Sequence, residues 1–313
     1  KDWMNMSVAY NEGFKIKVAR FGDNMRNVAV TDGDKIEAQI QFGWYVDYYG
    51  IGDLVEIARS VADEEVDELF EQYKSEYEFD YGDYDKAKWE RHVKEQARYE
   101  IALKKFLDEG GYTAFTTNFE DLHGMDQLPG LAVQRLMAQG YGFSGEGDWK
   151  TAALNRFMKI MSHNKATGFM EDYTYELKSG KEAILQSHML EVDPTFSVGK
   201  PRVLVAPLSI GNKADPARLV FDGKAGEGIA VTVADFGTHF KVIVTEIEAF
   251  TPEESAPNLP VARVLWRLKS GFEEGVKAWI ENGGGHHTVA SLNVNVEQII
   301  DWAKMCDVEI VVI

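Results

Sequence analysis

The spacing of apolar residues changes partway along the chain, near residues 160–168. Before that point, β-type runs alternate with segments in which apolar residues recur at helical spacing. After it, short β-type runs follow one another, with turn signals such as Ser179-Gly180 and Asp222-Gly223 between them. We therefore expect two domains, which also suits a length of 313 residues.

The first domain is expected over residues 1–165, with 1–16 as a leading segment. Alternating strands and helices predict an α/β domain with a Rossmann-like open sheet. Asp32-Gly33 is expected to be a hairpin turn between two short strands. The expected strands cover residues 14–20, 28–31, 35–41 and 113–117, and the expected helices lie at 51–70, 84–109, 131–138 and 150–161.

The second domain is expected over residues 166–313. It is predicted to be mainly antiparallel and β-barrel-like, with a few helices, because several of its strands can pair as hairpins. The expected strands cover residues 168–177, 183–190, 202–206, 218–221, 228–235, 240–250, 261–268 and 308–313, and the expected helices lie at 271–281 and 296–305.

Charge and composition exclude several classes of partner. The formal net charge is -18, so nucleic acid and anionic membrane surfaces are disfavoured. We find no run of 18 apolar residues and no apolar signal core at the start, so neither membrane insertion nor secretion is predicted. The single cysteine, Cys306, is expected to be a buried inert thiol, and a cytoplasmic location is expected. Since the chain begins with Lys1 rather than Met, we interpret it as a fragment or a trimmed protein.

Three segments carry residues suited to chemistry. In the first, Glu146 stands between Gly145 and Gly147 just before a predicted helix. Glycines let the backbone turn tightly and approach a ligand. The carboxylate is therefore expected to project from a loop at the end of the α/β sheet, where such folds place ligands.

The second segment places Glu171 and Asp172 next to each other inside an otherwise apolar strand. Neighbours on a strand point to opposite faces, so only one of these acids can face a given pocket. A carboxylate on a buried face needs a cation or a proton.

The third segment has three glycines before His286 and His287, which predicts an open loop with imidazoles at its tip. His188 lies in a further β-type run. Each feature alone has an ordinary explanation, such as a solvated Glu, a hydrogen-bonded core His or a surface His pair. Together they predict one divalent ion held by Glu146, Glu171, His188 and one of the two adjacent histidines. Carboxylates with neutral imidazoles suit Mn²⁺, Co²⁺ or Mg²⁺ better than a structural zinc, which favours cysteines.

Long stretches around these residues closely resemble the L-arabinose isomerase family. The similarity runs over nearly the whole chain, which makes it highly specific. It is carried by residues 145–153, 169–175, 187–192 and 284–288, and also by 19–26, 42–44 and 215–219.

The resemblance implies a central α/β domain, a C-terminal β-rich domain and a metal-dependent isomerase that interconverts L-arabinose and L-ribulose, and also D-galactose and D-tagatose. It implies that Mn²⁺, with Co²⁺ or Mg²⁺ as substitutes, binds the residues that match the ligands of the family. These are Glu146, Glu171, His188 and His287. The substrate-binding residues implied are Met25, Phe119 and His286.

Members of the family are longer at the N-terminus by a whole domain of roughly Rossmann type. The resemblance implies that this domain helps to assemble hexamers and covers the active site of a neighbouring subunit. We therefore expect a homo-oligomer. Because this sequence lacks the segment, a catalytically weak or inactive fragment that binds sugar and metal is the main alternative.

For the reaction, we expect an enediol route in which Glu146 acts as base and Glu171 as acid. Glu146 is favoured as base because its glycine-flanked loop leaves it more freedom than a strand leaves Glu171. A metal-assisted hydride shift is the competing route, and a metal-dependent hydrolase is a third interpretation of the same residues.

Overall fold

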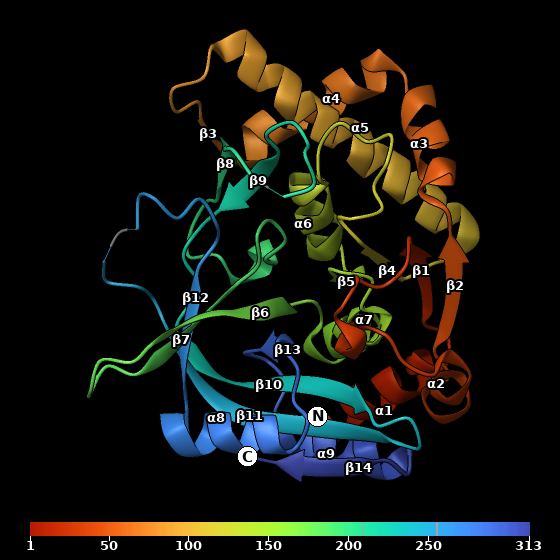
Figure 1. Cartoon of the computed structure of the whole chain (residues 1–313), viewed down its shortest axis with the longest axis vertical. Coiled ribbons are helices and arrows are strands. Elements are labelled where there is room, and N and C mark those ends of the chain that lie inside the picture. Colours follow the sequence, from red (N-terminus) through yellow and green to blue (C-terminus); the bar gives the residue numbers. More distant parts are fainter. Residues whose placement is uncertain (209, 255) are drawn as a thin grey trace.

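The computed structural model describes residues 1–208, 210–254 and 256–313 (Figure 1). A four-stranded parallel sheet lies at the centre of the first half, in the order β2-β1-β4-β5. The two middle strands are almost wholly buried, as a sheet covered on both faces requires, whereas β2 is a mostly exposed edge strand. The strands are β1 (Lys17–Phe21), β2 (Tyr45–Tyr49), β4 (Ala114–Thr117) and β5 (Gly142–Ser144).

Helices cover both faces of this sheet, because neighbouring strand residues face opposite cores. Ala19 and Phe21 pack into one core, and Val18 packs into the other. The first core includes α3 (Ile51–Ser60), α4 (Asp63–Glu76), α5 (Lys86–Gly110) and α6 (Gly130–Ala138). The second includes α1 (Asp2–Gly13), α2 (Lys35–Phe42), α7 (Trp149–Ser162) and α9 (Val296–Met305).

Six strands of the second half form a closed antiparallel barrel in the order β10-β13-β6-β7-β12-β11, and the β10–β11 pairing completes the ring. Helix α8 (Phe272–Glu281) lies beside it, and β14 (Glu309–Val312) adds a parallel strand to β11 (Figure 1). The barrel strands are β6 (Thr167–Glu176), β7 (Ala183–Ser187), β10 (Gly226–Asp235), β11 (Phe240–Phe250), β12 (Val264–Leu268) and β13 (His287–Ser291). The predicted fold class, an α/β sheet followed by a β-barrel-like part with a few helices, is confirmed.

Two predicted strands in the first half are wrong. Residues 28–31 contain a short 3-10 helix, η1 (Ala29–Thr31), and residues 35–41 belong to α2. The side chain of Asp34 accepts hydrogen bonds from the first turn of α2, and Gly43 ends the helix with a left-handed φ of 73°. These end signals outweigh the alternation of apolar residues, and Ile36 and Ile40 are exposed.

Two further strands of the second half exist but lie outside the barrel. They are β8 (Arg202–Val205) and β9 (Ala217–Val220), which form a small sheet with β3 (Glu78–Asp80) from the first half. This sheet is placed above the barrel in Figure 1. A second 3-10 helix, η2 (Pro194–Phe196), lies between β7 and β8.

Helix α7 ties the two halves together. It packs against the parallel sheet and also against β6, β10 and β13 of the barrel. Its Phe157 ring lies 4.5 Å from the Trp302 ring of α9, measured between centroids. Phe119, after β4, and Glu146, after β5, line one pocket together with Glu171 of the barrel strand β6.

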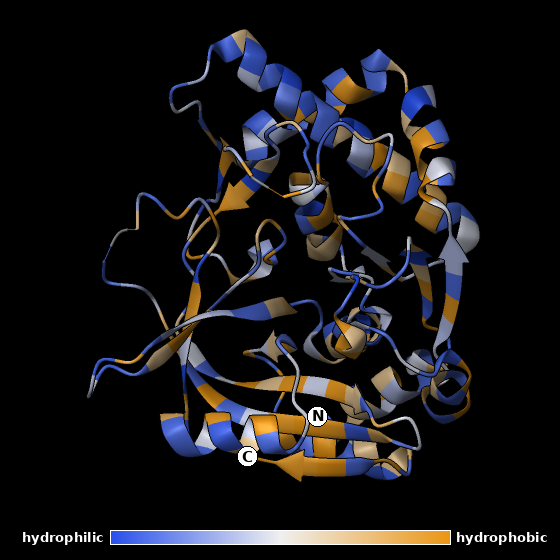
Figure 2. Ribbon diagram, viewed as in Figure 1, coloured by the Kyte–Doolittle hydropathy of each residue, from blue (hydrophilic) through white to orange (hydrophobic). Residues whose placement is uncertain are grey.

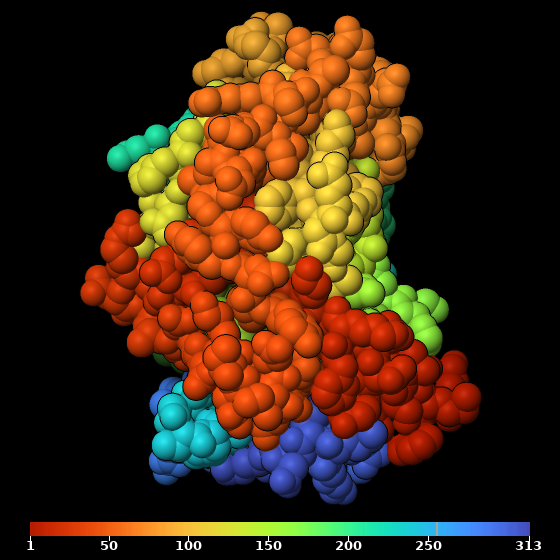
Figure 3. All heavy atoms as spheres, turned by 90° about the vertical axis from the view of Figure 1, so that its right-hand side faces the viewer, coloured from red at the N-terminus to blue at the C-terminus, as the bar shows by residue number. Residues whose placement is uncertain are grey.

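Hydropathy along the ribbon agrees with this arrangement. Apolar residues are frequent on β11 and β14, whereas α4 and α5 carry many hydrophilic residues (Figure 2). Figure 3 shows that N-terminal residues, in red and orange, cover much of one face of the molecule above the blue C-terminal end.

Cys306 is buried, as expected. Among the described residues, no helix is both long enough and apolar enough to cross a membrane.

Candidate active site

Glu146 lies in the loop between β5 and α7, at the carboxyl end of the parallel sheet. Its backbone has a left-handed φ of 62°, a costly conformation for a residue with a Cβ and one that is enriched at functional sites. At the neighbouring positions, Gly145 and Gly147, a larger residue would clash with nearby atoms. A Cβ on Gly147 would lie 2.5 Å from the backbone oxygen of Asp23, and one on Gly145 would lie 3.0 Å from Cε1 of His188.

The barrel brings the other predicted residues together through strand register. His287 pairs with Glu171 between β13 and β6, and Glu171 pairs with Ser187 between β6 and β7. His188 directly follows β7. Residues far apart in sequence therefore meet because their strands are neighbours in the barrel. Alternation on β6 directs Glu171 to the pocket that contains Glu146, and Asp172 lines a different cavity, inside the barrel.

The ligand-type atoms form two adjacent groups. In the first, Oε2 of Glu146 lies 3.2 Å from Nε2 of His286 and 3.6 Å from Nε2 of His287. These three residues each offer an atom within 4.8 Å of the others, a spacing that could hold a metal ion. In the second group, Oε2 of Glu171 lies 3.9 Å from Nε2 of His188. The rings of His188 and His287 are 6.1 Å apart between centroids, so the two groups border one space.

Each buried imidazole is held by a carboxylate on its far side. Nδ1 of His287 lies 2.9 Å from Oδ2 of Asp148, and Nδ1 of His188 lies 2.5 Å from Oε2 of Glu191. Such carboxylate partners fix the orientation of metal-binding histidines. Within the described part of the chain, the buried Nε2 of His287 has no hydrogen-bond partner. An unpaired nitrogen beside carboxylates fits a bound cation.

The charges in the site follow from burial and from these contacts. Burial raises the pKa of Glu146, but the hydrogen bond from His286 and the neighbouring histidines outweigh it, and the pKa is lowered. Burial lowers the pKa of His287 more than Asp148 raises it, so this imidazole favours its neutral, ligating form. Burial also lowers the pKa of His188, but the charge and hydrogen bond of Glu191 prevail and raise it to about 9.

A pocket of about 290 Å³ adjoins the two groups. Its walls include Met25 and Phe119, the two residues expected to contact substrate, together with Glu146, Glu171 and His188. The backbone N–H of Met25 donates to the carbonyl oxygen of Glu146 at 2.9 Å, so the loop that carries Met25 is tied to the Glu146 loop. His286, the third such residue, contacts Glu146 at the edge of this pocket.

The histidine pair differs from the sequence expectation. His287 is the first residue of β13 and is 2% exposed, so it is not at the tip of an open loop. The orienting roles of Asp148 and Glu191 were missed. The spacing of Glu191, three residues after His188, was the only local signal, and the contact between Asp148 and His287 joins residues 139 positions apart.

Comparison with known proteins gives a consistent result over most of the chain. Residues 17–164 match the L-arabinose isomerase central domain, and residues 166–309 match the L-arabinose isomerase C-terminal domain. The chain is 68% identical over 312 residues to a protein of Oceanobacillus iheyensis named L-arabinose isomerase, and equally to L-arabinose isomerase 2 of Bacillus licheniformis. It is 60% identical over 312 residues to L-arabinose isomerase 1 of Clostridium acetobutylicum.

These alignments cover the whole of this chain but only part of each relative. The covered share is 66% of the first two proteins and 64% of the third. The chain thus spans slightly less than two thirds of the length of the relatives it matches. The two matched domains together take in nearly all of its residues, and the chain therefore belongs to the L-arabinose isomerase family.

Proposed function

We propose that this protein is a metal-dependent aldose–ketose isomerase that interconverts L-arabinose and L-ribulose, and also D-galactose and D-tagatose. The observation that carries the proposal is one pocket lined by two carboxylates and by His188, an imidazole oriented by a carboxylate. A second such imidazole, His287, lies beside Glu146, and its buried Nε2 is unpaired among the described residues. Its support from relatives is that proteins 68% identical to the chain carry the name L-arabinose isomerase.

The residues proposed to hold the metal are Glu146, Glu171, His188 and His287. Oxygen and imidazole donors suit Mn²⁺, with Co²⁺ or Mg²⁺ as substitutes. When bound, a divalent ion supplies Lewis-acid polarisation of the sugar oxygens. His286, 3.2 Å from Glu146, and the pocket residues Met25 and Phe119 are proposed to position the sugar.

The proton transfers are assigned to the two glutamates. Glu146 takes the proton from C2 of the open-chain aldose, while Glu171 gives a proton to the carbonyl oxygen on C1, which yields an enediol. Glu146 then returns its proton to C1 and Glu171 recovers one from the oxygen on C2, which yields the ketose. The lowered pKa of Glu146, caused by His286 and its neighbours against the effect of burial, keeps this group ionised as a base requires.

A non-catalytic function is the main alternative. Because the chain spans slightly less than two thirds of its relatives, the same site could bind metal and sugar with weak or no turnover. Measuring L-ribulose after incubation with L-arabinose and Mn²⁺, with and without a chelator, separates the two. Metal-dependent formation of L-ribulose is expected, and a chain that binds Mn²⁺ and sugar but forms no ketose would support the alternative.

Two further experiments test the roles of the glutamates. Glu146→Gln is expected to lower turnover by about a hundredfold or more, because the base is removed, whereas Glu95→Gln on α5 serves as a matched control with normal turnover. Deuterium placed at C2 is expected to exchange partly with solvent. Complete retention of deuterium in the product would favour a hydride shift over the enediol route.

We also propose that the chain divides into domains near residue 165, acts in the cytoplasm and assembles as a homo-oligomer. The change from a parallel sheet to a barrel supports the division. Exposed apolar side chains support assembly, notably Trp3 on α1 and Ile40 on α2, which are 63% and 70% exposed. Light scattering of the purified chain tests assembly, and a monomer at all concentrations would contradict it.

A further inference from the structure

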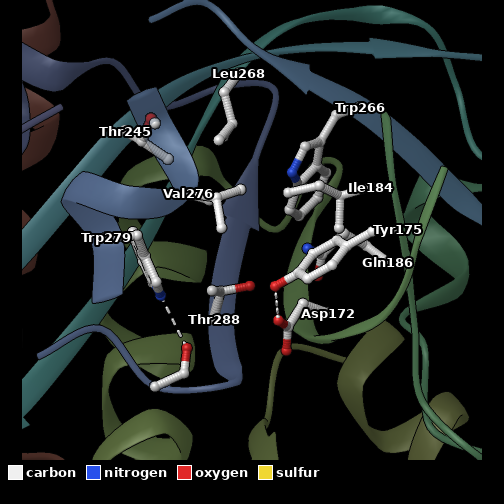
Figure 4. Close-up of a pocket in the computed structure, with 13 residues that line it drawn as sticks. Asp172, Tyr175, Ile184, Gln186, Thr245, Trp266, Leu268, Val276, Trp279 and Thr288 are labelled. Atoms are coloured by element: carbon white, nitrogen blue, oxygen red, sulfur yellow. Dashed lines mark hydrogen bonds between the residues drawn. The ribbon is translucent and has the colours of Figure 1, made fainter. Parts of the chain in front are cut away.

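A second cavity lies inside the barrel, on the reverse side of the strands that carry candidate metal ligands (Figure 4). Alternation along β6 and β13 turns Glu171 and His287 to the active site, and their neighbours Asp172 and Thr288 line this cavity. Residues of all six barrel strands and of α8 line it. The space inside measures about 40 Å³.

Two buried polar atoms on lining residues lack partners. Oε1 of Gln186, on β7, and Oγ1 of Thr288, on β13, have no hydrogen-bond partner among the residues that the structure describes. Gln186 is 2% exposed and Thr288 is 5% exposed. Buried polar groups in folded proteins are nearly always paired with protein, water or a ligand. Two such atoms from different strands on one cavity therefore indicate an occupant that forms hydrogen bonds.

The remaining walls are largely apolar. Trp266, Val276 and Trp279 surround the space in Figure 4, and the indole N–H of Trp279 already donates to the carbonyl oxygen of Gly285 at 2.9 Å. Asp172, the one acidic side chain among the described lining residues, accepts a hydrogen bond from the hydroxyl of Tyr175. Among the described lining residues there is no Lys, Arg or His, so an anion would find no charged partner here.

We propose that this cavity is a binding site for a small uncharged alcohol of two carbons. The hydroxyl of the ligand donates to Oε1 of Gln186 and accepts from the hydroxyl of Thr288, while its carbons pack against Trp266 and Val276. The size follows from the volume. A water needs about 10–15 Å³ of such space, so the cavity holds roughly three water-sized groups.

The site is tested by ligand-observed NMR with ethanol and the full chain, in the absence of metal and sugar. Saturable binding is expected, with a dissociation constant in the millimolar range. Thr288→Val and Gln186→Leu each remove one polar partner while keeping a similar shape, and each is expected to weaken binding tenfold or more. Thr238→Val, at an exposed position between β10 and β11, is the matched control and is expected to bind normally.

A variant that fills the cavity keeps the test decisive if a polar variant folds poorly. Ala230 lines the cavity from β10, and Ala230→Leu is expected to abolish binding. A signal that rises linearly with ethanol, or binding that is unchanged in Ala230→Leu, would overturn the proposal and leave the cavity to water alone. Since the measurement uses neither metal nor turnover, its outcome is independent of the proposed isomerase activity.

Discussion

Nδ1 of His287 lies 2.9 Å from Oδ2 of Asp148, and both side chains are buried. The same carboxylate caps α7, because it accepts hydrogen bonds from the backbone N–H and the hydroxyl of Thr151 at 3.1 and 2.8 Å. Asp148 belongs to the helix that covers the parallel sheet, and His287 belongs to a barrel strand. One side chain therefore couples the start of a helix to a candidate metal ligand in the other half of the molecule.

Replacing Asp148 by Ala is expected to weaken Mn²⁺ binding by about 10- to 100-fold, because His287 loses the group that orients its ring. Isothermal titration of the metal-free protein with Mn²⁺ measures the change. Asp34→Ala provides the matched control, since Asp34 caps α2 in the same manner. Equal Mn²⁺ affinities in these two variants would show that the contact has no role in metal binding.

The lowered pKa of Asp148 is expected to make the stability of the protein depend on pH. Burial raises the pKa of Asp148, but Lys150 and His287 outweigh it and lower the pKa from 3.8 to about 2. A carboxyl group whose pKa is depressed on folding stabilises the protein above its unfolded pKa, and this contribution, about 2 kcal/mol, is lost as the pH falls from about 4 to 2.

Urea unfolding of the wild type and of Asp148→Asn between pH 5 and pH 2 measures this contribution. The difference in unfolding free energy between the two proteins is expected to shrink as the pH falls, because only the wild type has the titrating group. A difference that stays constant over this range would mean that folding does not lower the pKa of Asp148.

Glu191 is expected to set the protonation of His188. The pKa of His188 is raised to about 9, since the charge and hydrogen bond of Glu191 prevail over the lowering effect of burial. In Glu191→Gln this pKa is expected to fall by about one unit or more. Histidine NMR titration of the metal-free protein measures it, with Glu176→Gln at the exposed end of β6 as control. An unchanged His188 titration would contradict the assignment.

Phe157 is expected to be a major contributor to stability. The ring is fully buried between the halves, 4.5 Å from the ring of Trp302, so Phe157→Ala should lower the unfolding free energy by about 3–5 kcal/mol. Leu177→Ala, at a position that is 69% exposed, should change it by less than about 0.5 kcal/mol. Chemical denaturation measures both, and similar losses would show that α7 does not anchor the two halves.

Local signals predicted α5 and α7 well, because apolar spacing and end residues act within a few positions. The single helix expected at 51–70 is instead two helices, α3 and α4. Asp148 near the start of α7 and Gly110-Gly111 at the end of α5 lie where expected. The strand expected at 35–41 is wrong because a second local signal was stronger. The capping of α2 by Asp34 favours a helix over the strand that the alternation of apolar residues suggested. The pairing of β3 with β8 could not be foreseen, because these strands are about 120 residues apart.

The sequence alone determined the change from alternating strands and helices to successive strands, and it marked Glu146, Glu171, His188, His286 and His287 by their residue types, glycine neighbours and family resemblance. The tertiary structure decided how these residues meet and what orients them. The register of β13, β6 and β7 places Glu171, His287 and His188 together, and Asp148 and Glu191 hold the two buried imidazoles. Strand pairing and burial depend on contacts across the whole chain, and a linear sequence does not record which distant residues will be neighbours.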